Sequence, residues 1–232
     1  MAAVTPPHAT PQIVYPERDG KPMAETDTHR QVMMDTITTL ADFFRDRPDV
    51  YVAGNLLLYY EEGNPAAAVA PDVFVVVGVP KHPRRIYKLW EEGQSPAVVI
   101  EVTSRSTRLD DLGTKRVLYE SLGVPEYFLF DPLAEYLHLP LQGYRLANGE
   151  YVRLEAEPDG ALASQRLGLR LRPEDGHLRL INAATGDLLL RPDEVADAQR
   201  AAEERLAAAE AEIAQLRAEL ARLRDPSASE TD

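Results

Sequence analysis

A chain of 232 residues is long enough to bury one good-sized hydrophobic core without help from metals or disulfides. Its composition, 44% hydrophobic and 27% charged, is typical of a soluble globular protein, and the absence of cysteine excludes disulfides and thiolate metal sites. The net charge of −13 argues against a broad basic footprint on nucleic acid.

The acidic charge is spread over the whole chain. Segment 193–232 holds eleven acidic residues and five arginines, a balance of −6, and the other residues hold 27 acids and 20 bases, a balance of −7. No apolar run approaches the roughly 18 residues of a membrane span, and the N-terminus lacks a basic-then-apolar signal segment. We therefore expect a cytoplasmic protein with no membrane contact.

Residues 1–22 are rich in Pro and Thr and are interpreted as a flexible lead-in, with a short strand at Gln12–Tyr15. A helix capped by Thr26 or Thr28 should then run to about Arg45. Its buried stripe follows helical spacing: Met33, Ile37, Leu40 and Phe44.

Two residues near the start of this helix have both a structural and a functional interpretation. His29 lies one turn before the apolar stripe, as a packed or capping histidine or as a neighbour of a site. Glu25 is either a solvated acid or an additional acid on the metal side of such a site.

The next part of the chain alternates between strand and helix patterns. A β-type run over 49–61 is broken at Gly54-Asn55. The elements predicted after it are a strand at Val73–Val79, a strand at Ala97–Thr103, one helix over 107–122 that Gly123 stops, and a strand at Glu126–Phe130. This order predicts an α/β fold with a mixed sheet flanked by helices.

Short strands separated by turns follow up to Leu190 and predict a β-rich extension packed on the core. The expected strands are 143–146, 151–154, 167–171, 178–181 and 188–190. We assign 23–190 to one domain.

Residues 193–224 predict a long helix, and 195–223 can be placed on heptads. The a positions hold Gln199, Leu206, Ile213 and Leu220, and the d positions hold Val195, Ala202, Ala209, Leu216 and Leu223. The g and e positions pair with opposite charge in a parallel partner, as Arg205 with Glu210, Glu212 with Arg217, and Glu219 with Arg224. This pattern favours a homodimeric coiled coil, and a lone solvated helix is the alternative. Residues 225–232 should be disordered.

Three charged side chains lie where packing alone favours apolar residues. Asp72 opens a buried strand, either as a structural acid that caps a turn after Pro71 or as part of a site. Glu101 lies within another strand, where a carboxylate either faces solvent at a sheet edge or needs a cation, hydrogen-bond donors or a raised pKa. Lys115 lies in the middle of the inward face of the predicted helix, although a lysine there can also extend to solvent along its stem. Asp110 and Asp111 are assigned to the helix dipole.

The motifs that carry a family resemblance come in a fixed order, which is Pro71-Asp72, Glu101-Val102-Thr103-Ser104, the run from Asp110 to Lys115, Tyr119, Glu126-Tyr127 and Asp131-Pro132. Over roughly residues 20–190 the chain resembles the Uma family of restriction endonucleases, within the PD-(D/E)XK nuclease superfamily. The resemblance implies a restriction-endonuclease-like core and a coiled-coil extension.

The resemblance also implies a site that hydrolyses DNA. Asp72 and Glu101, with the carbonyl of Val102, would hold Mg²⁺ or Mn²⁺, which activates water and polarises the scissile phosphate. Thr103 stands where the family pattern has a lysine, and Lys115 would be the migrated replacement.

The leading hypothesis is thus a metal-dependent DNA endonuclease that dimerises through its C-terminal helix. The rival is a nuclease fold without turnover that acts as a dimerising or binding module, which Thr103 and the acidic body favour. An RNA or repair nuclease would share the same chemistry.

Overall fold

The computed structural model describes residues 13–18 and 26–224. The chain divides into two compact units, the first ending at Leu189 and the second beginning at Leu190. Within the described ranges, no helix combines the length and the apolar character that a membrane crossing requires.

Several expectations fall partly or wholly outside the described residues. The predicted disordered tail, 225–232, and most of the predicted lead-in, 1–22, lie there, as does Glu25. Of the strand expected at Gln12–Tyr15, only the last three residues are described, and they do not form a strand.

A mixed six-stranded sheet forms the centre of the first unit. Its strands in spatial order are β1 (Val50–Ala53), β4 (Val73–Val77), β6 (Val98–Val102), β7 (Glu126–Phe130), β8 (Leu141–Ala147) and β9 (Glu150–Arg153). β6 and β7 run parallel, and the other neighbours run antiparallel. The predicted α/β fold with a mixed sheet is confirmed.

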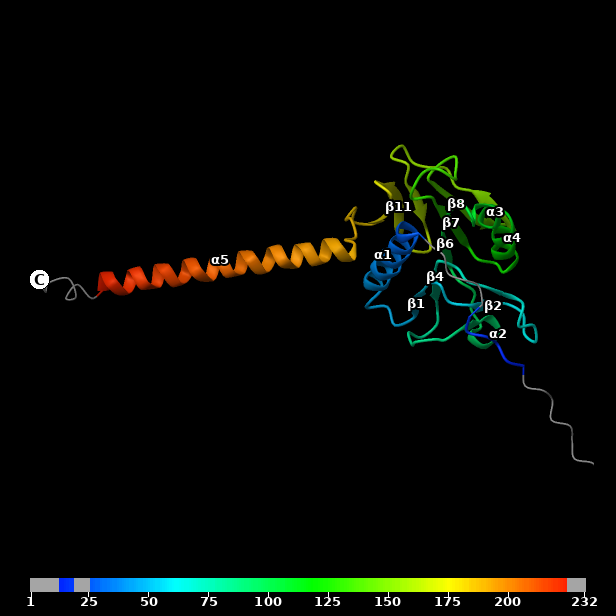
Figure 1. Ribbon diagram of the computed structural model, residues 1–232, viewed down its shortest axis with the longest axis horizontal. Coiled ribbons are helices and arrows are strands. Elements are labelled where there is room, and N and C mark those ends of the chain that lie inside the picture. Colours follow the sequence, from blue (N-terminus) through cyan, green and yellow to red (C-terminus); the bar gives the residue numbers. More distant parts are fainter. Residues whose placement is uncertain (1–12, 19–25, 225–232) are drawn as a thin grey trace, which may run out of the picture. The chain divides into compact units, whose positions relative to one another are not determined.

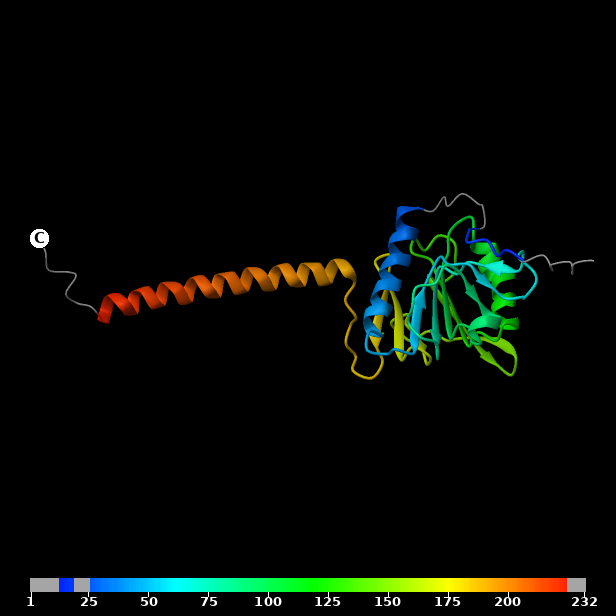
Figure 2. The same cartoon turned by 90° about the horizontal axis from the view of Figure 1, so that it is seen from below.

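Helices and small sheets cover both faces of this sheet. α1 (Asp27–Phe43) and the sheet of β10 (Leu162–Ser164), β11 (Leu169–Glu174) and β12 (His177–Asn182) share one core cluster with the strands. The other cluster includes α4 (Thr114–Ser121), β2 (Leu58–Tyr59) and β5 (Tyr87–Lys88), with β3 (Ala68–Val69) and α2 (Leu89–Glu92) beside them. Figures 1 and 2 show α1 (blue) and α3–α4 (green) on opposite sides of the strands.

Side-chain alternation along the strands separates these two clusters. Val98, Ile100 and Val102 belong to the α1 side, whereas Val99 belongs to the α4 side. By the same alternation Glu101 faces the α4 side of the sheet.

The start of α1 follows the prediction. Thr26 is its N-cap, and its side-chain oxygen accepts a hydrogen bond from the His29 amide at 3.2 Å. Met33 and Leu40 are buried in the core, as their spacing indicated.

The predicted single helix over 107–122 is wrong, because the structure has two. α3 (Arg108–Leu112) ends at Gly113, whose φ of −116° and ψ of −91° are not helical, and α4 begins at Thr114. A Cβ on Gly113 would lie 2.9 Å from the Leu109 carbonyl oxygen, so the break depends on glycine.

The β-rich extension also differs in part from the prediction. β8 and β9 join the central sheet, and only β10–β12 form a sheet of their own. Leu188 makes an isolated bridge to Ile181, so the strand expected at 188–190 is absent from the described chain.

The second unit contains α5 (Pro192–Arg224), the helix of 33 residues expected at 193–224. Apolar side chains along it are exposed, including Leu206 at 61%, Ile213 at 49% and Leu220 at 55%. Its pairing as a coiled coil stays a prediction.

The residues after β1 approach the start of β4 closely at Gly54. A Cβ there would lie 2.0 Å from the carbonyl oxygen of Asp72 and 2.5 Å from Cδ1 of Ile37, and the Asn55 amide donates to the Pro71 carbonyl at 2.8 Å. Only glycine allows this approach.

We therefore expect Gly54→Ala to lower the free energy of unfolding by about 3 kcal/mol, because backbone must move to admit the methyl group. Urea denaturation measures this change. Gly63→Ala is the control, since its Cβ would meet nothing within 4 Å and only its φ of +87° is strained. That variant should lose about 1 kcal/mol, and equal losses would contradict the close approach.

Candidate active site

The pairing of β4 with β6 brings Asp72 beside Glu101. In the antiparallel register Val73 faces Ile100, so the residues next to them, Asp72 and Glu101, meet at the end of the ladder. The Asp72 amide donates to Oε2 of Glu101 at 3.2 Å, and the Val102 amide donates to Oδ2 of Asp72 at 2.8 Å. Each carboxylate is thus held by the backbone of the other strand.

Lys115 reaches these strands from the first turn of α4. Its Nζ lies 3.0 Å from Oε2 of Glu101 and 3.0 Å from Oδ1 of Asp111. The Lys115 side chain is 20% exposed, whereas the two carboxylate side chains are 0% and 1% exposed. The ammonium therefore supplies the cation that two buried carboxylates require.

Asp111 has a contact that the sequence analysis missed. It does lie in the first turn of α3, as assigned, but it is buried and faces Lys115, whereas Asp110 is exposed. The signal was the spacing of four residues between Asp111 and Lys115, which places them on one face of the single helix predicted there. The hydroxyl of Tyr127 donates to the Asp111 carbonyl at 2.8 Å and fixes α3 against the sheet.

Tyr119 completes the surroundings of Glu101. Its hydroxyl donates to Oε1 of Glu101 at 2.7 Å, and the whole residue is buried. Tyr119 lies one turn after Lys115, so both side chains reach the same carboxylate from one face of α4. The helical spacing of Lys115 and Tyr119 was visible in the sequence, although their shared partner was not.

His29 contacts Asp72 from the other side of the sheet. Its Nε2 lies 3.3 Å from Oδ1 of Asp72, and the histidine is 4% exposed. Both interpretations of His29 therefore describe part of its environment, since it is packed at the start of α1 and also adjoins the acids.

Burial dominates the electrostatics of the cluster. It raises the pKa of the Glu101 carboxyl to about 8, against the opposing charge of Lys115, and it also raises the pKa of Asp111. At Asp72 burial also acts to raise the pKa, but the hydrogen bond and the charge of His29 contribute to a net lowering of the pKa. At Lys115 burial acts to lower the pKa, but the charges of Glu101 and Asp111 outweigh it and raise the pKa. Lys115 is therefore a cation, and one ammonium does not balance all the acids.

Thr103 follows Glu101 by two residues and lies at the end of β6. It is 1% exposed, and its Oγ1 has no hydrogen-bond partner within the described part of the chain. The Thr103 amide donates to the Phe130 carbonyl at 2.7 Å, which continues the parallel pairing of β6 with β7.

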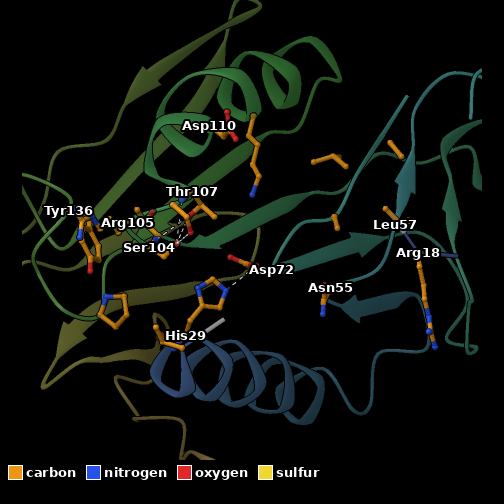
Figure 3. A pocket seen from close by; sticks show the side chains of 18 of the residues that line it. Arg18, His29, Asn55, Leu57, Asp72, Ser104, Arg105, Thr107, Asp110 and Tyr136 are labelled. Atoms are coloured by element: carbon orange, nitrogen blue, oxygen red, sulfur yellow. Dashed lines mark hydrogen bonds and ion pairs between the residues drawn. The ribbon is translucent and has the colours of Figure 1, made fainter. Parts of the chain in front are cut away.

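These residues open into a cleft of about 1140 Å³. Asp72, Thr103 and Lys115 line it together with His29 and residues of the loop 104–107. Figure 3 shows Asp72 and His29 between the loop on one side and Leu57 and Arg18 on the other. The cluster is thus accessible to a ligand through the cleft.

The donor set at this position fits a hard divalent cation. Mg²⁺ prefers oxygen ligands and is often held by one or two carboxylates, with water and phosphate at its other positions. Asp72 and Glu101 supply such oxygens, and because burial raises the pKa of Glu101, a divalent cation beside it would favour the ionised form that binds metal. Among the described residues no group of three or more His, Cys, Asp or Glu could hold a metal ion, so the candidate set is limited to two carboxylates.

The raised pKa of Glu101 predicts a stability that depends on pH. The folded protein keeps a proton on Glu101 that the unfolded chain releases above the ordinary value of 4.5. The free energy of unfolding should therefore fall as pH rises from 4.5 to about 8. Relative to Glu101→Gln, which cannot ionise, we expect the wild type to lose about 4 kcal/mol across this range.

Urea denaturation in EDTA at a series of pH values measures this difference. Glu155→Gln is the control, because Glu155 is exposed and should leave the pH profile unchanged. A constant difference between wild type and Glu101→Gln would contradict the assignment.

Comparison with known proteins agrees with the sequence resemblance. The Uma2 family model, described as "Putative restriction endonuclease", matches residues 7–180. Among solved structures, the chain is similar to "a putative nuclease belonging to DUF820" from Anabaena variabilis ATCC 29413, with 16% identity, a TM-score of 0.47, and coverage of 63% of this chain and 76% of that one. No curated protein matches the chain. Since the family model spans most of the sequence, the chain belongs to the Uma2 family.

Proposed function

We propose that the protein is a metal-dependent endonuclease that hydrolyses phosphodiester bonds of DNA. Asp72 and Glu101 hold Mg²⁺ or Mn²⁺ in this proposal, and Lys115 is the catalytic lysine. The observation that carries it is the position of the Lys115 Nζ, 3.0 Å from Glu101 and beside the cleft that Asp72 lines. Membership of the Uma2 family supports a nuclease activity.

When bound, the divalent ion would polarise the scissile phosphate and lower the pKa of the attacking water. Lys115 contributes hydrogen-bond donors to the phosphate oxygens, where negative charge grows in the transition state. Because Glu101 and Asp111 raise its pKa, Lys115 acts as a fixed cation and not as a base. Asp111 positions the ammonium, and His29 positions the Asp72 carboxylate.

A second candidate function is a binding module without turnover. Thr103 favours it, since the family pattern has a lysine at this position, and so does the acidic charge of the body. Calorimetry with Mg²⁺ and Mn²⁺ separates the two candidates. Absence of binding at millimolar concentration, unchanged in Glu101→Ala, would support the module.

The exposed apolar side of α5 is proposed to pair with a second copy of the chain. Leu206, Ile213 and Leu220 are exposed at the spacing of a coiled-coil seam. Glu212 and Arg217 occupy g and e positions of opposite charge, which favours a parallel homodimer. A cytoplasmic location stays a prediction of the sequence.

We expect the full-length protein to nick supercoiled plasmid in the presence of Mg²⁺ or Mn²⁺. Asp72→Ala and Glu101→Ala should abolish nicking, and Lys115→Met should reduce its rate by roughly 100-fold or more, the usual effect of removing one transition-state donor. Gel electrophoresis over a time course measures the rates.

Lys88→Met is the matched control. Lys88 is 21% exposed and paired with Glu91, so it resembles Lys115 in burial and ion pairing but lies outside the cleft lining. Nicking by Asp72→Ala at the wild-type rate, or equal losses in the two lysine variants, would overturn the assignment. Circular dichroism establishes that each variant is folded.

The coiled-coil proposal predicts that Ile213→Glu converts the dimer to a monomer, because it places a charge in the seam at an a position. Sedimentation equilibrium should show the dissociation constant raised at least roughly tenfold. Ala211→Glu introduces the same side chain at an outward f position and should leave the dimer intact. A monomeric wild type would refute the pairing.

A further inference from the structure

The cleft beside Asp72 carries two arginines that have no ion pair within the described residues. Arg105 and Arg18 both line it, and neither donates to a carboxylate in the described part of the chain. Figure 3 shows Arg105 on one side of Asp72 and Arg18 on the other. Other arginines of this acidic protein are neutralised by a carboxylate, as Arg84 by Glu92 and Arg170 by Glu157, whereas Arg105 and Arg18 leave their charge available to a ligand in the cleft.

The loop that bears Arg105 is fixed by its own hydroxyl groups. Ser104 Oγ lies 3.0 Å from Ser106 Oγ and 3.1 Å from Thr107 Oγ1, and the Ser104 amide donates to Thr107 Oγ1 at 3.0 Å. This network orders the loop before any ligand binds. The buried Thr103 hydroxyl, which has no partner in the described chain, lines the same cleft and offers a donor to a ligand oxygen.

Flat and apolar surfaces lie next to each arginine. Tyr136 is half-buried and lines the cleft beside Arg105. Leu57 lies on the side of Arg18, and small apolar residues such as Ala66 and Val69 also line the cleft. An aromatic ring next to a cation is the usual platform for an unpaired base and its phosphate.

The charge distribution distinguishes a single strand from a duplex. A duplex binder commonly neutralises six to ten phosphates over a wide surface, whereas residues 1–192 of this chain carry 27 acids against 20 bases. The lysine and arginine side chains that line the cleft are Arg18, Arg105 and Lys115, too few for such a footprint. Asp110 also lines the cleft, but it is exposed to solvent, which screens its charge.

We propose that the cleft binds one unpaired strand of DNA along its length. Arg105 and Arg18 hold phosphates on the two sides of the scissile one, and the Tyr136 ring stacks on a base next to the phosphate at Arg105. This inference rests on the proposed function and specifies its substrate as DNA that is single-stranded or locally unpaired at the point of cleavage.

The test is fluorescence anisotropy of the full-length protein with a labelled oligothymidine of about twelve nucleotides, in EDTA, over a range of salt concentrations. Arg105→Gln and Arg18→Gln should each weaken binding roughly tenfold and lower the slope of log K against log salt by about 0.7, the value for one phosphate contact to a single strand. Tyr136→Ala should weaken binding by a similar factor, and Tyr136→Phe should restore it.

Arg153→Gln is the matched control, because Arg153 is exposed, makes no ion pair within the described residues and lies outside the cleft. Tighter binding of a duplex than of the single strand at the same salt, or equal effects of Arg153→Gln and Arg105→Gln, would overturn the inference. Because EDTA excludes hydrolysis, this result is independent of the nicking assay. Metal-dependent nicking without a preference for single strands would overturn the single-strand inference and leave the proposed endonuclease function intact.

Discussion

An ammonium group enclosed by carboxylates determines the arrangement of the first unit. Lys115 lies between Glu101 and Asp111, both of which are almost completely buried. Removal of one partner from such a group typically costs 3–5 kcal/mol, because a charge is left buried without compensation. A leucine at the position of Lys115 would pack well but would leave the acids without a cation. The cluster also opens into a cleft, and buried ionisable groups with shifted pKa values in a cleft are the pattern on which the proposed metal site is based.

The fold supplies each part of this cluster through local geometry. The β4–β6 register sets Asp72 against Glu101, and the glycine at 54 lets the preceding chain pass within contact of the Asp72 carbonyl. The break at Gly113 separates α3 from α4, so Asp111 and Lys115 come from two short helices and still meet. Tyr119 then connects α4 to the strand. The contacts of Glu101 with Asp72, Lys115 and Tyr119 join segments far apart in sequence, so the site requires the folded sheet.

Much of this arrangement could be predicted from the sequence, because it follows from local patterns. Continuous apolar runs marked the buried strands, and a charge inside such a run, as at Glu101, was informative since burial of an acid requires a partner. The break at Gly113 was missed because residues at helical spacing on the inward face, such as Leu112 and Tyr119, continue across it. The pairing of β8 and β9 with the main sheet was missed because sheet membership depends on contacts distant in sequence. The contact of Asp111 with Lys115 was missed although it is local, because an acid in the first turn of a helix is already explained by the helix dipole.

The threonine at 103 is explained by the charge balance of the cluster. Alternation along β6 puts Thr103 on the same side as Glu101, so a lysine there would add a second ammonium to acids that Lys115 already contacts. A second cation would weaken the attraction of the carboxylates for a divalent ion. With the lysine supplied from α4, the strand position needs only a small side chain, and Thr103 lines the cleft with its hydroxyl buried. In the proposed mechanism the positive charge thus approaches the phosphate from the helix side, while the strand side is left to the metal.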